Sequence, residues 1–136
     1  MKRGILIGLI LAVATMFTLP ACGGKDSPTP AEDNLAITGN PALNGQQESQ
    51  APGPTFPLAV TVTSKMPPQG VKVVVTATPE GSSTSFYTDT KTTSSAASNF
   101  VITNTPKSVS CRVTVTVTSV SKSSNTVTAF YLYSMK

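Results

Sequence analysis

The chain has 136 residues, a formal net charge of +4, and neither histidine nor tryptophan. This composition excludes catalysis by a histidine base and metal sites with histidine ligands. Serine and threonine together number 37, against 16 charged residues, and the length suffices for one small domain.

The N-terminus has the order of an export signal. Met1, Lys2 and Arg3 form a short basic segment, and an apolar run of about 16 residues follows at positions 4–19. This run is shorter than the ~20 residues of a membrane-spanning helix. The order predicts a cleaved signal peptide over residues 1–21, with a plain secretory signal or a weak transmembrane anchor as the alternatives.

The predicted signal ends in Leu19-Pro20-Ala21-Cys22, and Gly-Gly-Lys-Asp follows. The first four residues resemble the lipobox of bacterial lipoproteins, and the next four resemble the start of mature lipoproteins from Bacteroidota. The resemblance implies that Cys22 becomes acylated and attaches the protein to a membrane, since two lipid signals suffice for stable anchoring. It further implies an outer-membrane lipoprotein exposed at the cell surface, with a periplasm-facing orientation as the alternative.

Residues 22–54 have the composition of a tether. Five prolines and five glycines are scattered among polar residues, and the apolar residues show no period. Such a segment buries too little apolar surface to offset the entropy of ordering. We expect a lipidated Cys22 followed by a flexible linker. In the alternative, Leu35-Ala36-Ile37 or Leu43 docks on the following domain as an extra edge strand.

From residue 56 onward, apolar and polar residues alternate, and Val and Thr dominate. Period two marks strands with one buried face, and β-branched residues favour strands. Clusters of Gly, Pro, Ser and Asn separate the runs. The pattern predicts an all-β domain over residues 55–136, with strands at about 56–65, 70–78, 83–91, 98–104, 109–119 and 125–134.

This order of short strands resembles the immunoglobulin-like and fibronectin-III-like β-sandwiches of bacterial surface proteins. The resemblance implies one sandwich of six to seven antiparallel strands. The antibody-type cysteine pair and core tryptophan are absent from the sequence. Architecture alone implies no function.

Three tyrosines are candidate ligand contacts. Phe86-Tyr87 and Phe130-Tyr131 each place neighbouring rings on opposite faces of a strand, so the pattern leaves open which ring is buried. An exposed tyrosine can stack on a sugar or a protein surface. Tyr87, Tyr131 and Tyr133 are therefore the candidate contacts.

Threonines form rows of the type Thr-x-Thr, which resemble the flat ice-binding faces of some antifreeze proteins. Because a sandwich is twisted and has two sheets, we expect the rows to divide between sheets and to form ordinary wet faces. The rows are Thr61/Thr63, Thr76/Thr78, Thr88/Thr90/Thr92 and Thr114/Thr116/Thr118.

Reactive groups are few in the predicted domain. Cys111 falls on the apolar side of its strand, which indicates a buried thiol, and Arg112 points to the opposite side. The two acids, Glu80 and Asp89, approach each other only if residues 78–90 form a hairpin, which is the arrangement an enzyme would require. We expect no enzyme and no cofactor, with a glycosidase-like use of Glu80 and Asp89 as the remote alternative.

The cations of residues 55–136 are scattered rather than clustered, which argues against a nucleic-acid partner. They are Lys65, Lys72, Lys91, Lys107, Arg112, Lys122 and Lys136. We expect a non-catalytic, lipid-anchored envelope protein that presents a β-sandwich for adhesion, protein interaction or surface-structure support. The alternative is a carbohydrate-binding accessory lipoprotein of a glycan-uptake system. The expected partners are the membrane, through Cys22, and another envelope protein or a glycan.

Overall fold

The computed structural model describes residues 31–136, so the predicted signal peptide, lipobox and Cys22 lie outside the described residues. Within residues 31–136, no helix is long and apolar enough to cross a bilayer. The strands are β1 (Ile37–Asn40), β2 (Phe56–Val62), β3 (Val71–Pro79), β4 (Tyr87–Thr93), β5 (Ala97–Ile102), β6 (Ser110–Ser119) and β7 (Thr126–Ser134).

Each strand predicted from residue 56 onward is present. Apolar and polar residues alternate along these strands, so one face is buried and the other is exposed. In β6, Cys111, Val113, Val115 and Val117 are buried, and the residues between them are half-buried. The largest shift from prediction is in β4, which begins at Tyr87 rather than near residue 83. Residues 83–86 instead belong to the β3–β4 loop.

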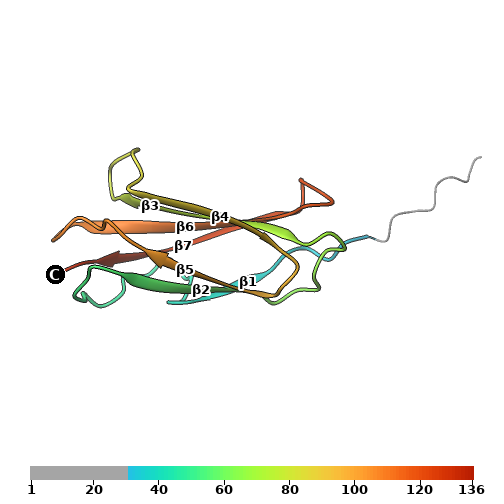
Figure 1. The fold of residues 1–136 in the computed structure, drawn as a ribbon, viewed down its shortest axis with the longest axis horizontal. Helices are drawn as coiled ribbons and strands as arrows, with labels where there is room; N and C mark the ends of the chain where they lie inside the picture. Colours follow the sequence, from blue (N-terminus) through green and yellow to red (C-terminus); the bar gives the residue numbers. More distant parts are fainter. Residues whose placement is uncertain (1–30) are drawn as a thin grey trace, which may run out of the picture. The chain divides into compact units, whose positions relative to one another are not determined.

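The strands form two antiparallel sheets that face each other (Figure 1). Strand order is β1-β2-β5 in one sheet and β4-β3-β6-β7 in the other. With the strands lettered A to G along the chain, a three-stranded A-B-E sheet lies against a four-stranded D-C-F-G sheet. This is an immunoglobulin-like β-sandwich, as predicted.

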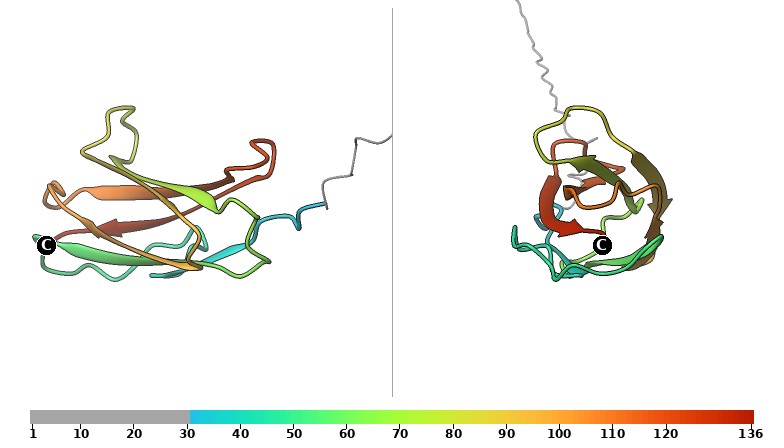
Figure 2. Two further views of the ribbon diagram at one scale, coloured as in Figure 1. Left: turned by 45° about the vertical axis from the view of Figure 1, so that its right-hand side comes forward. Right: turned by 90° about the vertical axis from the view of Figure 1, so that its left-hand side faces the viewer.

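The core lies between the two sheets, which are seen end-on as two layers of strands in the right-hand view of Figure 2. Valines supply much of it, with larger side chains at one end of the sandwich, and each fully buried side chain contributes about 1.5–3 kcal/mol. Cys111 is fully buried, which confirms the prediction for its thiol. The core residues include Leu58, Val60, Val71, Val73, Val75, Phe100, Ile102, Cys111, Val113, Val115, Val117 and Tyr131.

The prediction of a flexible linker reaching residue 54 is wrong for residues 32–54, which belong to the sandwich. Residues 32–136 form one compact unit. Leu35 is buried in the core, and β1 pairs with β2 in the register Thr38↔Thr61. The docking alternative for Leu35-Ala36-Ile37 is therefore what the chain forms, with the edge strand itself at Ile37–Asn40.

After β1 the chain leaves the three-stranded sheet and runs beside β7. We call residues 41–51 the crossover segment. It forms parallel bridges at Gln47↔Leu132 and Ala51↔Met135. The backbone N–H of Glu48 donates to Leu132 O at 2.7 Å, and that of Leu132 donates to Gln46 O at 3.0 Å. This docking uses mainly backbone groups, so a polar, proline-rich sequence achieves it without an apolar period.

A polar clamp holds the start of the sandwich against the β6–β7 loop. Asn125 Nδ2 donates to Glu32 Oε2 at 3.0 Å and to Asp33 O at 2.9 Å, while its Oδ1 accepts from Leu35 N–H at 3.0 Å. Glu32 also accepts hydrogen bonds from the hydroxyls of Ser119 and Ser121. The described chain thus begins at the end of the sandwich that carries the β6–β7 loop, and the C-terminus lies at the opposite end (Figure 1).

Candidate functional site

The three candidate tyrosines are not exposed stacking platforms. Tyr131 and Tyr133 point inward from β7, with 1% and 3% of their surface exposed. Leu132, which lies between the two tyrosines, and Phe130, which precedes them, lie on the outer face and are half-buried. The prediction that Tyr131 and Tyr133 contact a glycan or protein at the surface is therefore wrong, because the pairing of β7 with β6 directs both rings into the core.

Tyr131 and Tyr133 do come together in the wall of one cavity. We call it the side cavity, and its volume is about 480 Å³. β1 pairs only with residues 59–62 of β2, and residues of the crossover segment, Glu48 among them, line the cavity beside Phe56 and Leu58. Its wall residues include Glu48, Phe56, Leu58, Phe100, Tyr131 and Tyr133.

The polar groups of the side cavity differ in how they are satisfied. The hydroxyl of Tyr133 shares a 2.6 Å hydrogen bond with that of Thr105, and its ring packs edge-on against Phe56 at a centroid distance of 4.8 Å. The hydroxyl of Tyr131 is buried and has no hydrogen-bond partner in the part of the chain that the structure describes. Burial raises the pKa of Tyr133 to about 12. Burial, reinforced by the charges of Tyr133 and Glu48, raises the pKa of Tyr131 further, so both phenols are protonated at neutral pH.

Tyr87 packs its ring against the core rather than presenting it to solvent. It lies on the inward side of β4, opposite Ala77, and is half-buried. Its hydroxyl donates to Asp89 Oδ2 at 3.4 Å, and burial followed by the charge of Asp89 raises its pKa. Lys91, two residues further along, lies 4.7 Å from the centre of the Phe100 ring and donates to the backbone oxygen of Asn99.

The threonine rows divide between the two sheets, as expected, but unequally, because three of the four rows gather on one sheet. Register places them side by side on the outer face of β4-β3-β6-β7, which we call the hydroxyl face. In the fourth row, Thr61 lies on β2 of the other sheet, and Thr63 follows the end of that strand. The threonines of the hydroxyl face are Thr88, Thr90 and Thr92 of β4, Thr76 and Thr78 of β3, Thr114, Thr116 and Thr118 of β6, and Thr126 and Thr128 of β7.

Neighbouring hydroxyls on this face interact directly. The hydroxyls of Thr116 and Thr128 lie 3.3 Å apart, and those of Thr118 and Thr126 lie 2.9 Å apart. Strand geometry spaces the side chains by about 4.8 Å across the strands and about 6.7 Å along them. The face is thus an ordered array of donors and acceptors with little charge.

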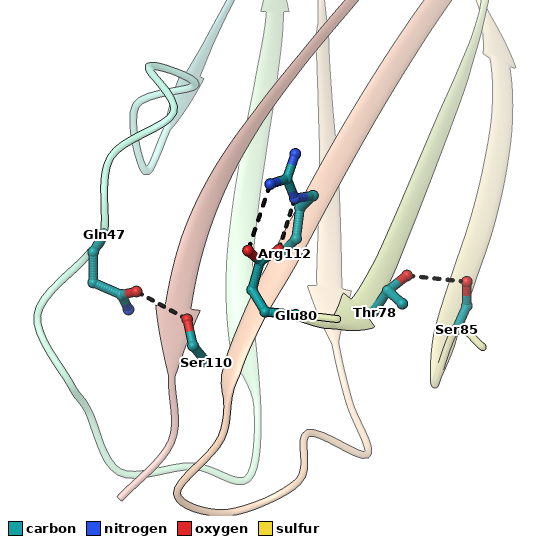
Figure 3. Close-up of polar contacts among 6 residues, drawn as sticks. All are labelled: Gln47, Thr78, Glu80, Ser85, Ser110 and Arg112. Carbon is teal, nitrogen blue, oxygen red and sulfur yellow. Dashed lines mark hydrogen bonds and ion pairs between the residues drawn. The ribbon is translucent and has the colours of Figure 1, made fainter. Parts of the chain in front are cut away.

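One end of the hydroxyl face carries an ion pair. Arg112 Nε donates to Glu80 Oε1 at 2.8 Å, and its Nη2 donates to Oε2 at 3.5 Å. Figure 3 shows this pair beside the Gln47–Ser110 contact, in which the Ser110 hydroxyl donates to the crossover segment at 3.0 Å. The guanidinium also lies 4.1 Å from the centre of the half-buried Phe130 ring, so it partly covers that ring.

Stability should fall in acid because two carboxylates bind hydrogen-bond donors only in the folded chain. Donation from Ser121 and Asn125 holds the pKa of Glu32 below its ordinary value of 4.5, and donation from Arg112 does the same for Glu80. A lowered folded-state pKa gives stability that is present above pH ~4.5 and is lost as the pH falls through the folded-state value. We expect the urea midpoint to drop between pH 6 and pH 3, and to drop less in the Glu32→Gln/Glu80→Gln double variant. A Thr61→Ala control should keep the wild-type slope, and an equal slope in the double variant would contradict the prediction.

The structure does not bring Glu80 and Asp89 together. Glu80 pairs with Arg112 on the outer side of the sheet, whereas Asp89 lies opposite Val75 on the inward side of β4. Burial raises the pKa of the Cys111 thiol, and this residue lies away from the outward-facing Arg112. Among residues 31–136, no group of three or more Asp, Glu or Cys gathers to hold a metal ion.

The sequence pattern identified Tyr131 and Tyr133 as candidate contacts but did not predict that both line a cavity. Glu48 and the crossover segment, which make the open side of the cavity, lie in a polar tract that has the composition of a linker. No period or motif marks this tract. The only available signal was the docking alternative at Leu35 and Leu43.

No protein-family model matches the chain, and neither a curated protein nor a solved structure matches it.

Proposed function

We propose that the chain is a non-catalytic, lipid-anchored protein of a bacterial cell envelope, and that its sandwich presents the hydroxyl face to another envelope component. The observation that carries the second part is the gathering of threonine rows from four neighbouring strands on one outer face. The first part rests on the lipobox resemblance at Leu19–Cys22.

The hydroxyl face suits contact with a neutral partner. Its two ends carry Lys72 and the Arg112–Glu80 pair, and the rows between them hold threonines with Val74 and Phe130. Threonine side chains have one rotatable carbon–carbon bond, so ordering them in an interface costs little entropy. Rows of hydroxyls can donate to and accept from protein backbone or sugar hydroxyls without desolvating a charge.

A catalytic role has less support from the described residues. The two carboxylates that an acid/base pair would need lie on opposite sides of one sheet, and one of them is held by Arg112. The single described cysteine is buried.

The anchor is tested by separating the full-length protein between aqueous and detergent phases after expression in a lipoprotein-processing bacterium. Wild-type protein should enter the detergent phase, and Cys22→Ser protein should stay in the aqueous phase. Cys111→Ser is the matched control and should partition like wild type. A Cys22→Ser protein that still enters the detergent phase would show that lipid on Cys22 is not the anchor.

The hydroxyl face is tested by placing a photo-crosslinking residue at Thr116, in its centre, in the bacterium that produces the protein. A crosslinker at Thr61, on the outer face of the other sheet, is the matched control. We expect a discrete adduct from position 116 and none from position 61. Adducts of equal yield from both positions, or from neither, would reject the hydroxyl face as the contact surface.

The carbohydrate-binding alternative keeps the same anchor and the same face but names a glycan as partner. A glycan array probed with wild-type and Thr116→Lys protein separates the two. Binding that the lysine abolishes would favour the glycan, and a blank array with a protein adduct at position 116 would favour a protein partner.

A further inference from the structure

The outer edge of β4 is the longest strand edge that the described chain leaves unpaired. Strand order places β4 at one end of its sheet, and no strand of residues 31–136 pairs with its outer edge. At the opposite end of that sheet, the crossover segment covers β7 through backbone hydrogen bonds. A seven-residue edge without proline or glycine is a template for pairing with another chain.

The backbone of β4 directs every second residue to this free edge. Phe86 N–H donates to Ala77 O at 3.0 Å, so Ala77 belongs to the residues of β3 whose backbone groups face β4. Bonded positions alternate along an antiparallel pair, and therefore three residues of β4 direct their backbone N–H and C=O groups outward. The Thr90 N–H agrees with this direction, since it donates to the Asp89 carboxylate at 2.8 Å rather than to β3. The three outward-directed residues are Thr88, Thr90 and Thr92.

The inward side of β4 carries opposite charges two residues apart. Asp89 is half-buried and accepts from the Tyr87 hydroxyl at 3.4 Å. Lys91 is exposed and donates to Asn99 O. Inward-facing charges at a sheet edge deter an ordinary strand from pairing there. The strand that fits has a cation opposite Asp89 and an anion opposite Lys91, at the same spacing.

We propose that β4 pairs with β4 of a second copy of this chain, antiparallel and with the two-fold axis at Thr90. In this register Asp89 lies opposite Lys91 of the second copy, and the two-fold symmetry repeats that pair on the other side of the axis. These charged residues occupy the positions that are not hydrogen-bonded across the new pair, where side chains approach most closely. The strand β4 thus supplies both charges that its own edge requires.

The same register satisfies the free backbone groups of β4. Thr90 bonds to its counterpart, and Thr88 bonds to Thr92 on each side of the axis, which gives about six backbone hydrogen bonds. The Thr90 N–H exchanges the Asp89 carboxylate for a backbone oxygen, and this carboxylate becomes available to Lys91 of the second copy. An ammonium group has three donors, so Lys91 can keep its bond to Asn99 O.

The pairing extends the sheet that carries the hydroxyl face. Its two-fold axis runs perpendicular to the sheet, so both copies present the hydroxyl face on the same side, as one continuous surface. The two described chains begin equally far from this surface, which is compatible with two anchors in one membrane. The inference does not depend on the proposed function, because edge pairing needs neither the anchor nor a partner on the hydroxyl face.

Cysteine crosslinking tests the register. The protein is the chain of residues 22–136 with Cys22→Ser, which contains the compact unit of residues 32–136 and keeps only the buried Cys111. It is oxidised with copper phenanthroline at about 0.1 mM, because an edge interface belongs to the small, weak class. Added Thr90→Cys should give a disulfide-linked dimer, since Cα atoms of bonded pairs lie about 5.5 Å apart, within the range of a disulfide.

The matched controls lie on the same strand and face. In the proposed register, Thr88 and Thr92 each lie about 14 Å from their own counterparts. Thr88→Cys alone and Thr92→Cys alone should therefore form dimers at least about 10-fold more slowly than Thr90→Cys. An equal mixture of the two variants should crosslink, because Thr88 of one copy lies opposite Thr92 of the other.

Charge reversal tests why the partner is a second copy. In the Thr90→Cys protein, Lys91→Glu places like charges opposite each other on both sides of the axis and should slow dimer formation about 10-fold. Asp89→Lys should do the same. When the two variants are mixed, one of them with a larger tag, opposite charges face each other again, and the mixed dimer should form at the original rate. Circular dichroism checks folding, and the exposed Lys91 gives the variant that disturbs the core least.

Two results would overturn the inference. One is dimer formation by Thr90→Cys that is no faster than that of Thr88→Cys or Thr92→Cys. An edge that instead binds an extended segment of a different protein would give this result, because the purified Thr90→Cys chain would remain monomeric. The other is a rate that both charge reversals leave unchanged, or that mixing them fails to restore, since either outcome means that Asp89 and Lys91 do not face each other.

Discussion

A chain that begins at residue 55 should be less stable than one that begins at residue 32 by about 5 kcal/mol or more, and this loss approaches the whole stability of a small domain. Truncation removes Leu35 from the core, and burial of such a side chain contributes about 1.5–3 kcal/mol. It also removes the backbone hydrogen bonds between the crossover segment and β7, each with a net contribution of about 0.5–1.5 kcal/mol. The edges of β2 and β7 and the ring of Tyr131 would then face water.

Urea unfolding followed by circular dichroism measures this difference directly. Residues 55–136 should show a broad transition at low urea or none, while residues 32–136 should unfold cooperatively. A chain that begins at residue 22 is the control and should match residues 32–136. Equal midpoints for the chains from residues 55 and 32 would mean that β1 and the crossover segment contribute nothing to the fold.

Asn125→Ala should destabilise the domain by about 2–4 kcal/mol, the second large effect. Its side-chain oxygen is the partner of the Leu35 N–H, and its amide donates to Asp33 O and to the Glu32 carboxylate. Asn125 is itself buried, so alanine leaves the Leu35 N–H unsatisfied in an apolar setting, which costs more than an exposed hydrogen bond would.

The control lies in the same loop. Ser123 is exposed, and Ser123→Ala should change stability by less than about 0.5 kcal/mol. Hydrogen exchange separates local from global effects, since the amides of Leu35 and of β1 should lose protection first in the Asn125→Ala protein. An unchanged urea midpoint together with unchanged exchange at Leu35 would show that the clamp is dispensable.

Much of the fold follows from local pattern. Val113, Val115 and Val117 alternate with threonines, and that alternation alone places β6 with one face in the core. Cys111 belongs to the same run, which is why its burial was predictable. The presence of the strands from residue 56 onward and the sandwich class follow in the same way, because a strand with one apolar face must bury it against another sheet.

The limits of that pattern appear in the candidate sites. Phe130 and Tyr131 are both compatible with the core, and only the pairing of Thr114 with Phe130 on the outer side settles which one is buried. Period two states that neighbours lie on opposite faces but does not state which sheet a strand joins. The pattern therefore could not show that Thr88, Thr90 and Thr92 of β4 join the same face as the threonines of β3 and β6, while Thr61 lies on the other sheet.

The residue pattern alone predicts an all-β sandwich with a buried thiol, excludes histidine chemistry, and gives an N-terminus that resembles a lipoprotein signal. Three further features depend on the folded chain: residues 32–54 complete the sandwich, three of the threonine rows share one outer face, and Tyr131 and Glu48 line one cavity. The crossover segment is held through backbone hydrogen bonds. Such bonds form with almost any side chains, so they leave no periodic pattern in the sequence. The segment's partner strand, β7, lies about 80 residues further along the chain, so the contact exists only once both sheets have assembled.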